Sequence, residues 1–360
     1  MSVDNLDHFD LSSVDLNGEI NEEVLQQLIR IDEWQNPLLS RIGSSGIGNA
    51  TFEWTMRKHN TPLLDNQIVD GADAGADESK TGIRVTNHSQ ILTKILRVST
   101  RAIEANTIAR ANELALQIQE RGTELMRDKE AQFLSNNGST AGTDTVAGVT
   151  AGLGAWLVSE DIDGNATAHI ESVAGSGPST QGGWPNKTGN TIEGRDYTAP
   201  TVPGPMTETA FKNVSQAIYE SGGNATIIMS EPATHRTLGE FFFDDGARIG
   251  NLDSTIAQAD RGGAVAQGRV NIWVSDFSVY SLVANRNQQV ADASTGSSSA
   301  YLLDPGKLAN VDLHGMRVAN LAKTGLADNR QLEWDGGLRV DTWEAHGAVV
   351  DIDNSLPMVP

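Results

Sequence analysis

Apolar and polar residues alternate strictly in two stretches of the first hundred residues. Residues 50–57, "ATFEWTMR", carry Phe52, Trp54 and Met56 on one face and polar residues on the other, which is the period of a half-buried strand. A second extended run follows at 82–98, after a stretch rich in Asp, Ala and Gly. The pattern predicts a long β-hairpin with an acidic, flexible distal end.

Helical spacing marks two further segments. Apolar residues recur every three or four positions over residues 19–34 and again over 107–136, which indicates amphipathic helices. The second segment is the strongest periodic signal in the chain. At a rise of about 1.5 Å per residue it would be about 45 Å long. A helix of this length would cross the whole molecule, and Gly138 is expected to end it.

The rest of the chain is uneven. Residues 138–206 are rich in Gly, Ser and Thr and predict a loop-rich insertion, in which Asp163-Gly164 has the composition of a hairpin turn.

An α/β pattern follows the insertion. It consists of a helix at about 208–220, a buried strand at 225–230, a helix starting at Ser230 with Pro232 in its first turn, a loop at about 245–268, strands within 269–275 and 279–285, a Ser-rich loop at 293–299, and short strands running to Ile352. Helices and strands are unevenly mixed, so the predicted fold class is α+β.

One predicted strand carries a possible catalytic pair. In "LRVDTWEAHGAVVDI" at 338–352 every second residue is apolar or nearly so, but Glu344 and His346 fall on the same face. Two residues apart on a strand, their Cα atoms would be about 6.5–7 Å apart. One His and one carboxylate are too few for a metal site, and an acid/base pair also needs a pocket and a nucleophile. A Glu344–His346 hydrogen bond that satisfies both groups within a sheet is the favoured interpretation.

Composition and charge exclude some classes of protein and disfavour others. The chain has 360 residues and no cysteine, which excludes disulfides, thiolate catalysis and cysteine-based metal sites. No apolar run approaches the roughly 20 residues that span a bilayer, and the acidic N-terminus lacks the basic start of a secretory signal. The net charge of −21 disfavours binding to nucleic-acid phosphates and suits a protein that stays soluble at high local concentration.

The candidate cation and nucleotide motifs are incomplete. Asp161, Asp163 and Asn165 match three ligand positions of a calcium loop, but Ala166 and Ser172 replace its Gly and its bidentate Glu, so a hairpin turn is favoured. The acidic end of the first hairpin has a spacing that fits no known site and is expected to be a solvated loop; its members are Asp65, Asp70, Asp73, Asp77 and Glu78. The Gly-rich stretch at 43–48 lacks the strand-to-helix setting of a dinucleotide fingerprint. No cofactor and no metal are predicted.

Several stretches resemble one branch of a known family. They are "NPLLSRIGSSG" (36–46), "FEW" (52–54), "ANELALQIQERGTELMRDKEAQFL" (111–134), "AGLGAWLV" (151–158) and the long segment from "YLLDPGK" to "GAVVDI" (301–352). With the order of the predicted elements, they resemble the major capsid (head) proteins of tailed bacteriophages, which have the Hong Kong ninety-seven-type shell fold. None of these stretches is a catalytic motif, so the resemblance is a pattern of packing residues.

The resemblance implies a division of the chain. Residues 1–48 would be an N-terminal arm, 49–100 the extended E-loop hairpin, 101–138 the spine helix of the peripheral domain, 139–205 a Gly/Ser-rich insertion, 206–300 the axial domain, and 301–360 the return strands of the peripheral domain and the C-terminus. It places Glu344 and His346 in the peripheral-domain sheet beneath the spine helix, as a structural pair.

The resemblance also implies a function without enzymatic activity. The chain would assemble with itself into hexamers and pentamers of an icosahedral head, which encloses double-stranded DNA without sequence-specific binding. Portal, scaffolding and cement proteins would be further partners, and the protein would be in the host cytoplasm during assembly and then in the virion.

Phe52, Trp54 and Met56 are the expected intersubunit contact of the E-loop. A two-stranded ribbon is marginal alone in water, and this face has no evident core of its own, so it is expected to lie on a neighbouring subunit. Two alternatives remain. One is the shell protein of an encapsulin-like nanocompartment, and the other is a hydrolase that uses Glu344 and His346.

Overall fold

The protein was analysed as a computed structural model. The structure describes residues 35–73, 75, 77–104, 112–157, 167–174, 203–241, 272–293, 297–323, 325–357 and 359. The predicted helix at 19–34, the Asp163-Gly164 turn with its calcium-loop match, and the predicted loop at 245–268 lie outside these residues.

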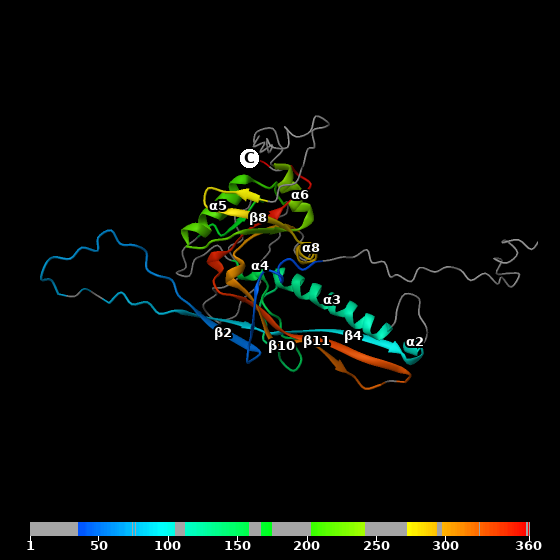
Figure 1. The fold of residues 1–360 in the computed structure, drawn as a ribbon. Coiled ribbons are helices and arrows are strands. Elements are labelled where there is room, and N and C mark those ends of the chain that lie inside the picture. The colour runs from blue at the N-terminus through cyan, green and yellow to red at the C-terminus, as the bar shows by residue number, and fades with distance from the viewer. Residues whose placement is uncertain are drawn as a thin grey trace, which may run out of the picture.

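The described strands form two large sheets and one ribbon (Figure 1). The four-stranded sheet has the order β1-β10-β11-β4; its strands are Gly43–Gly46, Leu308–Asn320, Ala327–Val340 and Gln90–Ser99. The six-stranded sheet has the order β5-β12-β9-β6-β8-β7; its strands are Ile170–Ser172, Gly347–Ile352, Ser298–Leu303, Ile227–Ser230, Val279–Ala284 and Ile272–Val274. The ribbon pairs β2 (Thr51–Met56) with β3 (Ile83–His88).

The long helix α3 (Glu113–Leu134) lies along the four-stranded sheet, after the short helix α2 (Thr100–Glu104) (Figure 1). It begins where the Asn112 side chain accepts a hydrogen bond from the Ala115 N–H, a typical N-cap. Its 22 residues make it about 33 Å long, shorter than predicted. The helix ends at Ser135, whose hydroxyl and N–H both donate to the Gln132 carbonyl, so Gly138 does not end it.

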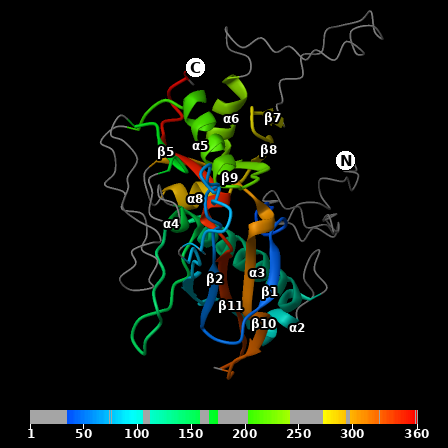
Figure 2. The same cartoon turned by 90° about the vertical axis from the view of Figure 1, so that its left-hand side faces the viewer.

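Helices cover both faces of the six-stranded sheet. Helices α5 (Glu208–Glu220) and α6 (Pro232–Phe241) lie on one face, and α8 (Gln288–Ala293) and α4 (Leu153–Trp156) lie toward α3 on the other (Figure 2). The predicted elements at 208–220, 225–230, 269–275 and 279–285 and the helix beginning around Pro232 are confirmed. Helix α8 was not predicted, because its six residues are too few to show a period.

One continuous core joins α3 to both sheets. Leu125 and Phe133 of α3 are buried with Leu332 of the four-stranded sheet and Tyr301 of the six-stranded sheet. A second core lies between α5 and the other face of the six-stranded sheet, around Phe211. The two sheets are therefore parts of one packed body.

The extended run at 82–98 is two strands. β3 pairs with β2 and confirms the predicted hairpin, but β4 pairs with β11 in the four-stranded sheet. The change occurs at Ser89, whose N–H donates to the Ala50 carbonyl at 2.7 Å. The hairpin therefore rests directly against the body of the subunit.

The predicted single strand at 338–352 is wrong. β11 ends at Val340, the 3-10 turn η3 (Trp343–Ala345) follows, and β12 begins at Gly347. β12 belongs to a different sheet from β11, so the alternating pattern joins two strands on either side of a corner. The expectation of short strands in this region is also wrong, because β10 and β11 have 13 and 14 residues.

The predicted divisions at 139–205 and 300/301 do not follow the sheets. Two described elements of the 139–205 segment belong to the body, since α4 is fully buried and β5 pairs with β12, whereas residues 140–147 are exposed. The boundary at 300/301 falls inside β9. The end of the predicted arm also enters the body: Leu38 is buried, and β1 pairs in parallel with β10 (Figure 2).

Candidate assembly surfaces and their junctions

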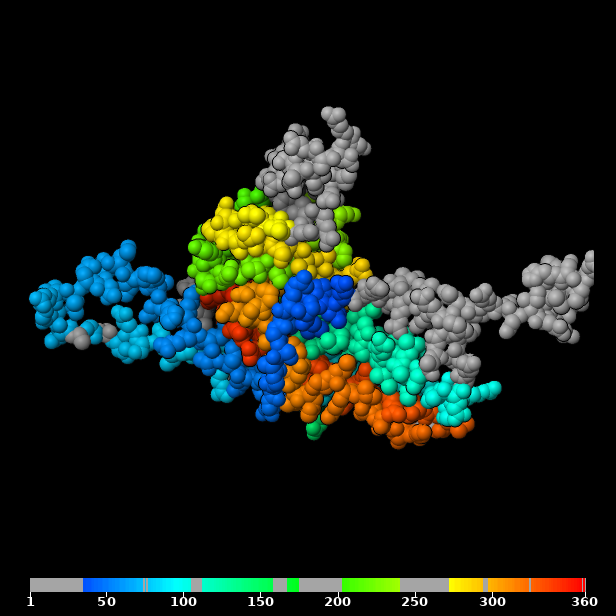
Figure 3. Space-filling model, in the orientation of Figure 1, coloured from blue at the N-terminus to red at the C-terminus, as the bar shows by residue number. Residues whose placement is uncertain are grey.

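A long loop projects from the subunit between β2 and β3 (Figures 1 and 3). Residues 57–82, here called the projecting loop, carry four strongly exposed aliphatic side chains; they are Leu63 (59%), Leu64 (96%), Ile68 (68%) and Val69 (78%). Its two arms are joined where Asn60 donates to the Glu78 carbonyl at 3.3 Å. Exposed apolar side chains grouped on one feature are typical of a binding surface.

The predicted anchor face at the base of this loop is already covered. Phe52 and Met56 are buried, at 7% and 5% exposure. The Trp54 ring stacks on Phe52 at 5.9 Å and lies 5.3 Å from the ring of Trp156, which is fully buried. The expectation that this face has no core of its own is wrong, because Trp156 of α4 packs against Trp54. Phe52 and Met56 are buried within the subunit and Trp54 is half-buried, and their role as an intersubunit contact stays a prediction.

Glu344 and His346 do not form the predicted pair. Glu344 lies in η3, and its Oε2 is 3.1 Å from the Lys58 Nζ at the base of the projecting loop. His346 is fully buried; its Nδ1 accepts a hydrogen bond from the Asp304 N–H at 3.1 Å, and its Nε2 has no hydrogen-bond partner. Both residues therefore hold structure together, but through different partners.

The surroundings of His346 also disfavour catalysis. Burial lowers the pKa of His346 to about 3, and neighbouring His169 adds to the effect. The His169 Nε2 lies 3.0 Å from the Glu344 carbonyl oxygen. A fully buried ring cannot reach a substrate, and an imidazole that is neutral at pH 7 lacks the additional proton of the imidazolium that would act as a general acid.

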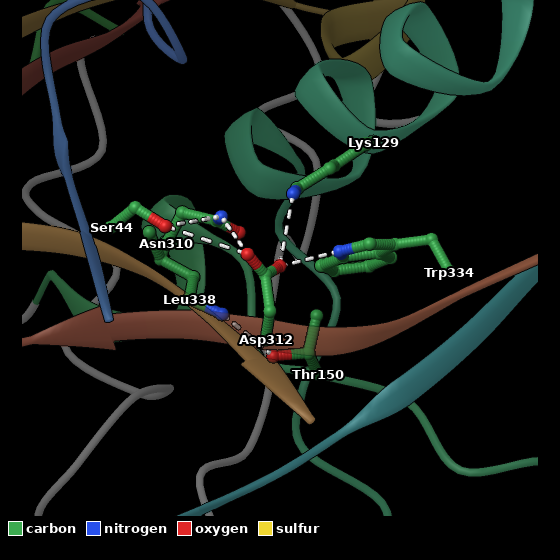
Figure 4. A network of polar contacts seen from close by, with 7 residues as sticks. All are labelled: Ser44, Lys129, Thr150, Asn310, Asp312, Trp334 and Leu338. Carbon is green, nitrogen blue, oxygen red and sulfur yellow. Dashed lines mark hydrogen bonds and ion pairs between the residues drawn. The ribbon is translucent and has the colours of Figure 1, made fainter. Parts of the chain in front are cut away.

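A polar junction links α3 to three strands (Figure 4). The Asp312 Oδ1 accepts from Lys129 Nζ at 3.4 Å and from Trp334 Nε1 at 2.5 Å. Its Oδ2 accepts from the Asn310 amide at 2.9 Å and the Ser44 hydroxyl at 3.5 Å. One carboxylate thus connects α3, β1, β10 and β11.

Lys129 is held in this junction with little solvent. Its ammonium lies 4.0 Å from the centroid of the Trp334 ring, a cation–π contact. Burial lowers the Lys129 pKa to about 8, and the nearby Asp312 carboxylate opposes part of that shift. The cation is therefore retained at neutral pH against a cost of desolvation.

A second buried carboxylate on α3 holds the chain at its entry into the body. Glu130 accepts hydrogen bonds from the Leu38 and Leu39 N–H groups at 3.1 and 3.3 Å and from the Asn285 amide at 2.6 Å. Burial raises the Glu130 pKa, and these hydrogen bonds oppose the shift. The turn that starts at Pro37 is thereby fixed to α3 and to the end of β8.

A third buried acid, Asp292 of α8, lies against the start of β9. Asp292 accepts from the Ser299 hydroxyl at 2.7 Å and the Ser299 N–H at 3.3 Å. Burial raises the Asp292 pKa to about 7, the Ser299 hydrogen bonds oppose this shift, and Glu231 adds to it.

Across the described ranges, no three acidic or His side chains converge as metal ligands. No helix among these residues has the length and apolar character needed to cross a bilayer.

Comparison with known proteins identifies the family. The model of the SU10 major capsid protein family matches residues 7–353. The chain belongs to the SU10 major capsid protein family. The major capsid protein of Escherichia phage Phieco32 is 28% identical to this chain in an alignment of 219 residues, and the match covers 55% of this chain. The match spans only 59% of that relative's length.

Solved structures agree on the fold of this SU10-family chain. A Mycobacterium phage Bobi structure has a TM-score of 0.54 at 12% identity, and covers 95% of this chain and 98% of its own. A Gordonia phage Cozz structure has a TM-score of 0.54 at 13% identity, with 97% and 95% coverage. The holo-SrpI encapsulin complex from Synechococcus elongatus has a TM-score of 0.53 at 9% identity, with 97% and 99% coverage. The predicted Hong Kong ninety-seven-type fold is therefore confirmed, and the family model confirms the predicted major capsid protein family.

The buried charges on α3 were missed in the sequence. Gly122, Leu125, Lys129, Glu130 and Phe133 are all buried in the helix, at the spacing of its apolar face. Two charged residues inside an apolar stripe are a signal of buried polar contacts. Their partners, Asp312 and the turn at Pro37, are too far away in sequence to be identified by spacing.

Proposed function

We propose that this subunit closes into the hexamers and pentamers of an icosahedral head around double-stranded DNA, and that the projecting loop makes a principal contact between subunits. The observation that carries the proposal is the loop itself, with four aliphatic side chains at 59–96% exposure on a segment that stands off the body. Membership of a capsid family supplies a partner for such a surface, namely a second copy of the chain.

The contact is weak for one subunit and strong for a shell. Burying each of these aliphatic side chains contributes about 1.5–3 kcal/mol. In a closed ring every subunit both provides a loop and receives one, so the contributions repeat around the ring. Loss of the apolar tip is therefore expected to prevent closure while leaving the subunit folded.

The net negative charge of the chain suits a shell that encloses DNA. A net charge of −21 gives a surface that repels phosphate. We propose that the shell encloses DNA without sequence-specific contacts, with portal, scaffolding and cement proteins as further partners, and that assembly takes place in the host cytoplasm.

The encapsulin-like alternative rests on likeness of fold alone, whereas the family model and the Phieco32 relative both favour a phage capsid. The hydrolase alternative has no support in the contacts of Glu344 and His346. Glu344 pairs with Lys58, and His346 is fully buried.

Electron microscopy of the expressed protein tests the proposal. The parent chain is expected to form closed particles, and the variant Leu64→Asp with Ile68→Asp is expected to remain a folded, unassembled subunit with unchanged circular dichroism. Val290→Asp is the matched control, because Val290 is 59% exposed outside the loop. Normal shells from the loop variant would refute the role of the loop, and a parent chain without particles would refute shell formation.

A further inference from the structure

The projecting loop leaves the subunit beside a buried corner of the chain. Lys58 is the second residue after β2, so it stands at the first arm of the loop. Its ammonium reaches Glu344, with Nζ and Oε2 separated by 3.1 Å. The Lys58 side chain is 28% exposed and that of Glu344 is 8% exposed. An ion pair with this little water is screened much less than one on the open surface.

Glu344 lies where the chain passes from one sheet to the other. It belongs to η3, between the end of β11 in the four-stranded sheet and the start of β12 in the six-stranded sheet. The turn is held firmly: the His346 N–H donates to the Trp343 carbonyl at 3.0 Å, and the fully buried Trp343 side chain anchors it. The carboxylate that Lys58 contacts is therefore fixed with respect to both sheets.

The second arm of the loop is fixed to the ribbon by a close approach. A Cβ on Gly82 would lie 2.5 Å from the Thr55 side chain and 3.0 Å from the Met56 carbonyl. Beyond this point the arms are joined by the Asn60–Glu78 hydrogen bond, which links them to each other and not to the body. The Lys58–Glu344 contact is thus placed where a small change of angle at the base becomes a large displacement at the tip.

We propose that Lys58 and Glu344 are a positioning pair that fixes the direction in which the projecting loop leaves the subunit. The inference rests on the proposed role of the loop in assembly, because a fixed direction is useful where the tip must meet a site on another copy. The ion pair links the loop to η3, so any change in the angle between the two sheets is transmitted to the loop. The pair contacts no partner itself and acts through the loop.

Distances measured in the unassembled subunit test the pair directly. The chain has no cysteine, so Asn66→Cys in the loop and Gln216→Cys on the exposed side of α5 give two spin-label sites without background. Double electron–electron resonance then reports the distribution of distances between loop and body. Lys58→Met is expected to broaden this distribution, and Lys58→Arg, which keeps the cation, to restore the narrow distribution of the parent.

Two further variants keep the result specific. Arg57→Met removes the same charge one residue away, at an exposed position, and should leave the distribution narrow. Glu344→Gln removes the charge at the other partner without changing its size, and should broaden the distribution as Lys58→Met does. If Lys58→Met does not fold, the Glu344→Gln measurement decides the question.

Assembly of the same variants without labels gives the second readout. Lys58→Met should lose regular closed shells, while Lys58→Arg and Arg57→Met retain them. A distribution as narrow as that of the parent in Lys58→Met or Glu344→Gln overturns the positioning role, whatever the shells do. Failure of the parent to form shells refutes the proposed function instead, since the distance measurement requires no assembly.

Discussion

Raising the pH from 8 to 10.5 should stabilise the native subunit relative to its Lys129→Met variant. The Lys129 pKa is lowered from 10.5 to about 8 in the folded state, mainly by burial. Between these values the unfolded chain holds a proton on this amine that the native state has already lost. Stability rises with pH wherever the unfolded state binds more protons.

The size of the effect follows from the shift. A change of one pKa unit corresponds to about 1.36 kcal/mol, so a shift of roughly 2.5 units corresponds to about 3 kcal/mol. Burying the charged Lys129 lowers the free energy of unfolding by this full amount below pH 8, and the cost disappears as the pH approaches 10.5. Met has no proton to lose and a similar length, so the difference in unfolding free energy between parent and variant isolates Lys129 from every other titrating group.

Urea unfolding of the unassembled subunit at a series of pH values measures this difference. The parent should gain about 3 kcal/mol relative to Lys129→Met over the interval. Asp312→Asn is the complementary variant: it leaves the buried cation without its carboxylate and should cost about 3–5 kcal/mol at pH 7, more than Lys129→Met. A parent-to-variant difference that does not change with pH would refute the assignment of a buried, charged Lys129.

Three further predictions concern single sites. Trp54→Asp should lower the melting temperature strongly, because it places a carboxylate against the buried Trp156; a folded variant with the parent's melting temperature would restore Trp54 as a surface anchor. The native pKa of Asp292, about 7, exceeds the usual 3.8, so the parent should lose up to about 4 kcal/mol of unfolding free energy as the pH rises from 4 to 7. Asp292→Asn should abolish this pH dependence. Parallel profiles of unfolding free energy against pH for the two proteins would contradict the prediction. Gly336→Ala should cost about 1–3 kcal/mol, because its Cβ would lie 2.2 Å from the Val311 carbonyl, whereas Gly315→Ala, with open space around it, should be neutral in the same urea titration.

The parts of the fold that the sequence predicted well are those in which one period persists. Helix α5 and strands β2 and β8 each keep a single spacing from end to end, and pattern alone identified them. β1 was missed because "GSSG" has no apolar residue to form a pattern; it is a strand because β10 offers a free edge. Such an element depends on its tertiary partner rather than on its own residues.

The predicted Glu344–His346 pair was wrong because one alternating pattern runs through two separate strands. The alternation in 338–352 continues through η3, so Glu344 and His346 appeared to lie on one strand when each faces a different partner. Trp54 packs against Trp156, a residue about a hundred positions away in a segment interpreted as a loop, and Met56 is buried in the same core. Contacts of such separation leave no trace in local spacing.

The strand order of the two sheets sets when the molecule can fold during synthesis. The last part of the chain provides β9 to the six-stranded sheet, β10 and β11 to the four-stranded sheet, and then β12 to the six-stranded sheet again. β9 and β12 lie between β5 and β6, and β10 and β11 lie between β1 and β4, so neither sheet is continuous until these strands have been made. At about 5–20 residues per second, the ribosome needs several seconds for this stretch. A nascent subunit therefore cannot complete its fold, or offer a finished surface to other copies, before β9 to β12 have been translated.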